Sequence, residues 1–233
     1  MLKVRAANER GHFQNAWLNS YHSFSFGEYY DPAHMGVSTL RVINEDSVTP
    51  GAGFPTHGHR DMEIVSYVLE GELSHKDSMG NGSVIRPGDV QRMSAGTGVS
   101  HSEYNPSNSS GTRFLQIWLL PTERGIAPGY AQKHFTEAER TGRLKLLVSP
   151  DGREDSISAN SDALMYGSIL SAKDQVSYTL PAGRQSYVQI ARGQALVNGT
   201  SVEAGDGITI RSEAEIHLTT DSTAEILLFD LPA

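Results

Sequence analysis

Short runs of β-branched and aromatic residues, separated by Gly, Pro, Asn and Asp, recur along this chain of 233 residues. Examples lie at 37–43, 63–69, 114–120, 187–190, 207–210 and 224–229. Short strands with turn residues between them are typical of β-sandwiches and barrels. The segments between the runs are too short for the crossover helices of a parallel sheet. We therefore predict an all-β fold with a few short helices, one of which begins at a capping-box pattern at 136–139.

A weak internal repeat divides the chain. Gly71 is followed, after a polar loop, by Gly88-Asp89, and Gly193 is followed by Gly205-Asp206. The first copy is longer by an insertion at 75–82. A Pro/Gly-rich stretch at 121–129 has the composition of a connector. We predict two domains, 1–135 and 136–233, and expect the polar chemistry in the first, which contains eight of the nine histidines.

The composition excludes several classes of function. The chain has no cysteine, which excludes disulfide scaffolds, thiol nucleophiles, zinc knuckles and iron–sulfur clusters. Its formal net charge of −8 disfavours binding to nucleic acids and anionic membranes. No apolar stretch approaches the roughly 20 residues that span a bilayer. The first residues contain no apolar segment typical of a secretory signal, so we expect a cytoplasmic protein.

Two pairs of polar residues have the spacing of metal ligands on strands. His57 and His59 are separated by one residue, as are His101 and Glu103, and side chains at i and i+2 point to the same face of a strand. Glu63 has the same parity as His57 and His59 if their strand stays regular. Imidazoles with one carboxylate suit one divalent transition metal, which could be Fe, Ni, Co, Cu, Mn or Zn. A lone His-x-His pair is a weak signal, and the alternative is that His57 and His59 are loop residues exposed to solvent.

These residues also resemble a known motif. Gly51-x5-His57-x-His59-x3-Glu63 followed by Gly71 resembles the first cupin motif, with its last spacing one residue longer than usual. The segment from Gly88 through Gly96 to 101–105 resembles the second motif, with two extra residues before the histidine. Together with GFPTHGHRDMEIVSYVLEGELSHKDS and MSAGTGVSHSEYNPS, they make the first half of the chain similar to the pirin family, and especially to its bacterial quercetinases (quercetin 2,3-dioxygenases).

The resemblance implies a bicupin of two jelly-roll domains that holds one metal ion in the first domain. The ligands of that family match His57, His59, His101 and Glu103. Glu63 occupies the place of the carboxylate ligand in many other cupins, so the two glutamates compete. We favour Glu103 as the ligand, with Glu63 behind it to orient an imidazole N–H. The second half has no comparable set, and we expect a structural role for its only histidine, His217.

The resemblance also implies a function. A flavonol such as quercetin would bind the metal through its 3-oxygen, Glu103 would accept the proton as general base, and dioxygen would cleave the ring with loss of carbon monoxide. We expect an apolar pocket formed by Phe54, Met93, Tyr104 and Trp118, although Met93 and Trp118 equally suit core packing. The alternatives are a regulatory binding protein that responds to metal or redox state, and a cupin with a purely structural metal. We expect a monomer.

Overall fold

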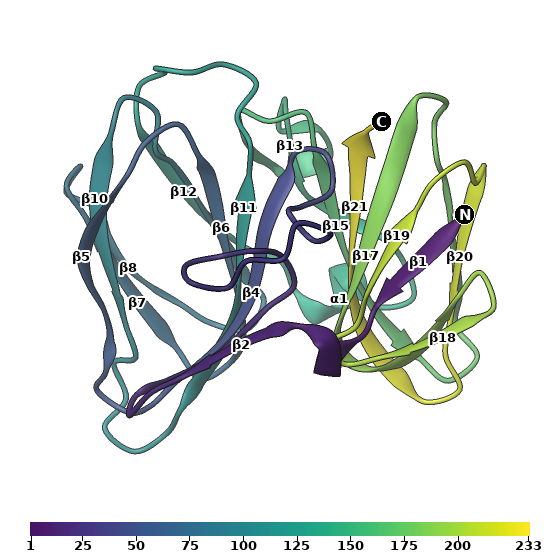
Figure 1. Cartoon of the computed structure of the whole chain (residues 1–233), viewed down its shortest axis with the longest axis horizontal. Coiled ribbons are helices and arrows are strands. Elements are labelled where there is room, and N and C mark those ends of the chain that lie inside the picture. The colour runs from purple at the N-terminus through teal and green to yellow at the C-terminus, as the bar shows by residue number, and fades with distance from the viewer.

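The computed structural model describes residues 1–233 and forms two β-barrel-like units side by side (Figure 1). A seven-stranded antiparallel sheet belongs to the first unit. Its order is β12 (Gly129–His134), β9 (Asp89–Ser94), β6 (Glu63–Glu70), β11 (Thr112–Leu119), β4 (Leu40–Val48), β3 (Leu18–His22) and β2 (Gly11–Gln14). A four-stranded sheet faces it, in the order β5 (Gly53–His59), β10 (Val99–Tyr104), β7 (Leu73–Asp77) and β8 (Gly82–Ile85).

The second unit is built on a ten-stranded sheet. Its main path is β1 (Leu2–Arg5), β19 (Gly207–Ile210), β17 (Arg184–Val197), β21 (Thr223–Pro232), β15 (Leu164–Ser171), β13 (Lys145–Ser149) and β14 (Ile157–Ser158). Branching from this path are β16 (Gln175–Thr179), β18 (Thr200–Glu203) and β20 (Glu215–Thr219). The amino-terminal strand β1 therefore crosses to the second unit, where it pairs with β19 (Figure 1).

Helices are few and short, as predicted. The α-helix α1 (Glu137–Arg140) begins at the expected capping box, in which Thr136 and Glu139 bond to each other's backbone N–H groups. Two 3-10 turns, η1 (Ala7–Glu9) and η2 (Arg153–Asp155), complete the set. None of these helices has the length and apolar character needed to cross a membrane. The all-β prediction is confirmed, whereas the domain boundary after residue 135 stays a prediction.

The two copies of the internal repeat have matching turns. Gly71 and Gly193 have φ angles of +71° and +73°, and Gly88 and Gly205 have φ angles of +94° and +90°. In each copy the aspartate after the second glycine accepts a hydrogen bond from the backbone N–H three residues earlier, at 2.9 Å. The left-handed conformation strains any residue with a Cβ, which explains why glycine stands at all four positions.

The apolar core is distributed unevenly between the units. The largest cluster, of 23 buried residues, lies between the two large sheets and contains Tyr67 and Leu115 from one side and Leu147 and Phe229 from the other. A cluster of 14 residues fills the second unit. Apart from its share of the largest cluster, the first unit contains only two small clusters, of six and four residues. Its remaining interior is lined by polar side chains, and this is where the candidate site lies.

Candidate metal centre

The two strands that carry the predicted ligands pair directly. Strands β5 and β10 are antiparallel, with His101 opposite His57 and Glu103 opposite Phe54. The register therefore shifts between His101 and Glu103, around Pro55 on β5. Proline has no backbone N–H to donate to a ladder, so it is tolerated at such an irregularity. The pairing brings both predicted ligand pairs into the first unit.

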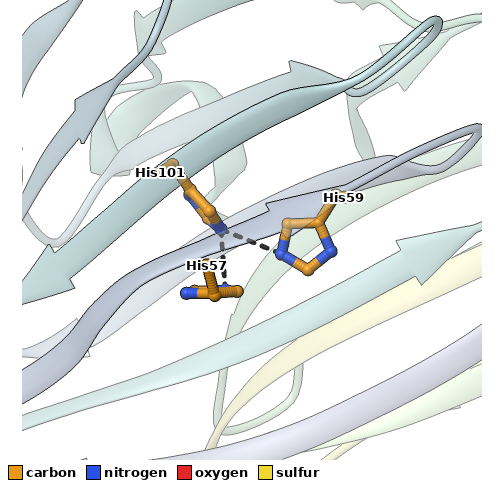
Figure 2. Close-up of side chains that lie close together, drawn as sticks. All are labelled: His57, His59 and His101. Atoms are coloured by element: carbon orange, nitrogen blue, oxygen red, sulfur yellow. Dashed lines mark hydrogen bonds between the residues drawn. The ribbon is translucent and has the colours of Figure 1, made fainter.

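Three imidazoles converge at this point, as Figure 2 shows. The Nε2 atom of His101 lies 3.0 Å from Nε2 of His59 and 3.1 Å from Nε2 of His57. Metal–nitrogen bonds of about 2.0–2.1 Å at right angles place two ligand nitrogens about 3.0 Å apart. The observed separations fit three nitrogens on one face of a single divalent ion.

The protonation states favour metal binding. Burial, followed by the neighbouring imidazoles, lowers the pKa of His101 to about 3 and that of His59 to about 4. Both rings are therefore neutral at pH 7, and neutral imidazole is the form that binds a metal. His57 donates its Nδ1–H to the Pro55 carbonyl at 2.9 Å, which leaves the lone pair of Nε2 free.

Glu103 lies behind the three imidazoles and is 2 % exposed. Its carboxylate accepts hydrogen bonds from Gln116 Nε2 at 2.8 Å and from Ser66 Oγ at 3.2 Å. Burial is the main cause of its raised pKa, although these bonds oppose the shift. Glu103 also forms a second group of close ligand atoms with His75 and His101. A buried carboxylate beside the imidazoles can serve both as a ligand and as a proton acceptor.

A cavity of about 490 Å³ opens in front of the imidazoles, a size typical of small-molecule sites. One part of its lining is aromatic, with Phe26, Phe54 and Trp118. Trp118 meets His59 edge-on at 5.1 Å between ring centroids, and it meets Phe26 in the same way at 5.3 Å. The other part is polar and includes Ser20, His22, Asn44, Asp46 and Gln116.

Comparison with known proteins places this geometry in a family. The pirin family model matches residues 3–119. The chain belongs to the pirin family. A second family model, described as the quercetinase C-terminal cupin domain, matches residues 146–231. The fold is thus the predicted bicupin.

Relatives of this pirin are similar over their full lengths. It is 46 % identical to an Escherichia coli protein named quercetin 2,3-dioxygenase, with 100 % of this chain and 99 % of that protein covered. A pirin-like protein of Caulobacter vibrioides is 39 % identical, with 99 % of each covered. The crystal structure of the bacterial pirin YhhW from E. coli, in complex with nickel(II), superposes with a TM-score of 0.95 at 45 % identity, covering 100 % of this chain and 99 % of that one.

The structure of the present chain brings some of the predicted site residues together and separates others. Phe54 and Trp118 line the cavity. Met93 does not, because it is fully buried in a small apolar cluster with Ile64. Tyr104 is also outside the lining, and 39 % of its surface is exposed at the end of β10. The two predicted pocket positions Met93 and Tyr104 therefore need correction.

Glu63 is also placed differently from the expectation that it orients an imidazole. The backbone turns at Asp61, where φ is +47°, and Glu63 begins β6 in the opposite sheet. Its carboxylate accepts a hydrogen bond from Ser94 Oγ at 2.8 Å, and Arg92 contributes an opposing charge nearby. The parity argument was wrong for Glu63 because its strand does not continue from His59.

A polar row that sequence reasoning missed forms the floor of the site. Asn44 lies directly opposite both His22 and Gln116, and Gln116 lies opposite Ser66. All four side chains are buried. Ser66 and Gln116 are single polar residues within apolar runs, whereas His22 and Asn44 lie in strands with several polar residues. Only the cross-strand register, which the sequence does not reveal, brings the four together. The one available signal was the alternation Asn44-x-Asp46 within β4.

Proposed function

We propose that this pirin is a metal-dependent dioxygenase that cleaves flavonols such as quercetin. The observation that carries the proposal is the set of three convergent imidazoles at the end of a cavity with both aromatic and polar walls. The relative named quercetin 2,3-dioxygenase, at 46 % identity over the full chain, supports the same activity. The nickel(II) complex of bacterial pirin YhhW supports a divalent transition metal at these imidazoles.

His57, His59 and His101 hold the ion, and Glu103 is the fourth ligand. A bound divalent ion supplies Lewis acidity, which lowers the pKa of a coordinated hydroxyl. Glu103 accepts the proton that this hydroxyl releases. Gln116 and Ser66 orient the Glu103 carboxylate through their hydrogen bonds and stabilise its charged form. Glu63 takes no part in this step, since it bonds to Ser94.

The cavity suits a flat, hydroxylated aromatic molecule. Phe26, Phe54 and Trp118 offer apolar surfaces against which fused rings can pack. The opposite wall is polar, and Asn44 and Gln116 contribute amide groups, whose oxygens are acceptors, to its lining. Phenolic hydroxyls are donors and can satisfy such acceptors. The wall therefore favours polyphenols over hydrocarbons of the same shape.

The experiment measures aerobic loss of the flavonol absorbance band with protein loaded separately with nickel, iron, cobalt, copper, manganese or zinc. Consumption of one dioxygen and release of one carbon monoxide for each flavonol are expected with at least one metal. His57→Ala should abolish both metal binding and turnover. His217→Ala is the control, because His217 is exposed on strand β20 of the second unit. An absence of metal-dependent flavonol loss with every ion would refute the proposal.

The regulatory alternative lacks a comparable observation, because neither the quercetin 2,3-dioxygenase of E. coli nor the pirin-like protein of C. vibrioides is named for such a role. The proposal includes a flavonol as the substrate and a monomer as the oligomeric state. Size-exclusion chromatography with light scattering measures the latter, for which a mass of about 25 kDa is expected from the chain of 25.3 kDa.

A further inference from the structure

A line of hydrogen-bonding groups extends from His101 away from the cavity. The Nδ1 atom of His101 lies 3.4 Å from Nδ1 of His75. The other nitrogen of His75, Nε2, lies 3.1 Å from Oδ2 of Asp77. Neither the His75 nor the Asp77 side chain is exposed to solvent. The register of β7 and β10 fixes this line, since Asp77 is directly opposite His101 and His75 is directly opposite Glu103.

When His101 binds a metal, only one placement of the ring protons on His101 and His75 lets every hydrogen bond in this line form. If Nε2 of His101 is a ligand, its Nδ1 carries the proton and donates it to the lone pair on Nδ1 of His75. The proton of His75 then lies on Nε2, which donates to the Asp77 carboxylate. A proton on Nδ1 of His75 would instead face the N–H of His101, and two donors would oppose each other.

Asp77 is itself held in place by the turn that follows it. Its Oδ1 accepts hydrogen bonds from the backbone N–H groups of Met79 and Asn81, at 2.9 and 3.0 Å. The side chain of Asn81 donates to both carboxylate oxygens. The carboxylate is therefore anchored independently of His75, and it dictates which nitrogen of His75 carries the proton.

The location of these residues in the repeat is informative. His75 and Asp77 lie on β7 and Asn81 lies in the turn before β8, in a hairpin whose counterpart in the second copy is β17–β18. The first copy is five residues longer, since 17 positions separate Gly71 from Gly88 and 12 separate Gly193 from Gly205. The second hairpin has no histidine or aspartate between positions 194 and 203, and its unit lacks the three imidazoles.

We propose that Asp77 and His75 are positioning residues that fix the tautomer of His101 and raise its strength as a metal ligand. This inference rests on the metal site of the proposed function, but not on the substrate or the reaction. The Asp77 carboxylate draws the proton of His75 toward itself, which makes His75 a better acceptor for the His101 N–H. That bond in turn increases electron density on Nε2 of His101, the atom that faces the ion.

The discriminating variant is Asp77→Asn. The amide oxygen can keep the bonds from the backbone N–H groups of Met79 and Asn81. The amide nitrogen replaces the oxygen that faces His75, which also ends the bond that this oxygen accepts from the Asn81 side chain. The amide then donates to His75, moves its proton to Nδ1 and opposes the His101 N–H. We expect the dissociation constant for cobalt(II) or nickel(II) to rise about 10- to 100-fold. The visible spectrum of the cobalt(II) protein should change as well.

A second pair of variants separates hydrogen bonding from packing. His75→Asn retains an acceptor oxygen near the position of Nδ1, whereas His75→Leu fills similar space without one. Asn should preserve much of the metal affinity, and Leu should lose it. Equal affinities in the two variants would mean that His75 acts through packing alone, which would overturn the inference.

The matched control is Asp89→Asn. Asp89 also bonds to an imidazole, His134 Nδ1 at 2.8 Å, and to one backbone N–H, but His134 is not part of either group of ligand atoms. This variant should bind metal as the unmodified protein does.

The proposal would be refuted if Asp77→Asn left both the metal affinity and the cobalt(II) spectrum unchanged. Binding of two ions per chain would also refute it, because the second ion would occupy His75. If the unmodified protein binds metal normally but does not consume flavonol, the proposed function fails and this inference about metal affinity is still tested by the variants.

Discussion

The buried carboxyl of Asp46 should give the metal-free protein an unusual pH dependence. Asp46 is 4 % exposed on the cavity wall, and burial raises its pKa from 3.8 to about 7. The hydrogen bond from Ser20 opposes this shift, whereas the charges of Glu103 and Glu45 add to it. A shift of this size corresponds to about 4 kcal/mol of differential stability between the neutral and charged forms.

The sign follows from the number of protons that each state binds. Between pH 7 and about 4 the folded state keeps the Asp46 proton, while the unfolded state loses it. The contribution of Asp46 to the free energy of unfolding is therefore most unfavourable above pH 7, and it improves as the pH falls toward 4. Asp46→Asn removes this titration. Its stability relative to the unmodified protein should rise by about 2–4 kcal/mol between pH 4.5 and 8.

The assay is urea unfolding of both proteins in the presence of a chelator, at half-unit steps from pH 4.5 to 8. Comparing the two proteins cancels the titration of the imidazoles and of the other carboxyls. An amide in place of the carboxyl adds a constant difference, so only the pH-dependent part tests the argument. Asp221→Asn, on an exposed turn, is the control and should give a flat difference. A flat or opposite trend for Asp46→Asn would refute the assignment.

Three further predictions concern the site and its support. Gln116→Leu removes the 2.8 Å hydrogen bond to Glu103, so kcat for flavonol loss should fall about tenfold while metal content, measured by elemental analysis, stays near one. Tyr67→Phe removes a hydroxyl that donates to Glu225 and accepts from Arg140, both at 2.5 Å. The free energy of unfolding in urea should fall by about 2–4 kcal/mol, and an unchanged urea midpoint would contradict this. When the free metal concentration is about 100 times its dissociation constant, removal of the metal by a chelator should cost about 2.7 kcal/mol of stability. Calorimetry should then show a Tm lower by about 5–10 °C, whereas His57→Ala should show no such change.

Local sequence patterns were sufficient to predict the strands and to place His57 near His59 and His101 near Glu103. The runs at 63–69 and 207–210 became β6 and β19, because β-branched and aromatic residues next to glycine turns, here at Gly71 and Gly205, favour extended strands. The i, i+2 spacing correctly placed His57 beside His59. The same spacing in His75-x-Asp77 was overlooked, although it gives those side chains the same face of the neighbouring strand.

Nonlocal contacts determined the remaining parts of the site. Met93 has the hydrophobicity expected of a pocket residue, but its strand β9 pairs with β6 in a register that buries it beside Ile64. The polar row formed by His22, Asn44, Gln116 and Ser66 depends on the registers of three strand pairs. A shift of one residue in any of them would turn a side chain to the opposite face of the sheet, so the sequence alone could not locate the row.

The uneven core suggests why the second cupin persists without ligands of its own. Much of the interior of the first unit is occupied by imidazoles, carboxylates and amides, and its two small apolar clusters contain only ten residues. Burying polar groups contributes little net stability compared with burying apolar surface. The outer face of the seven-stranded sheet supplies the missing burial, because Val65, Tyr67, Leu115 and Ile117 pack in the cluster shared with the second unit. The second cupin therefore provides the apolar contact that allows the first one to hold a polar, metal-binding interior.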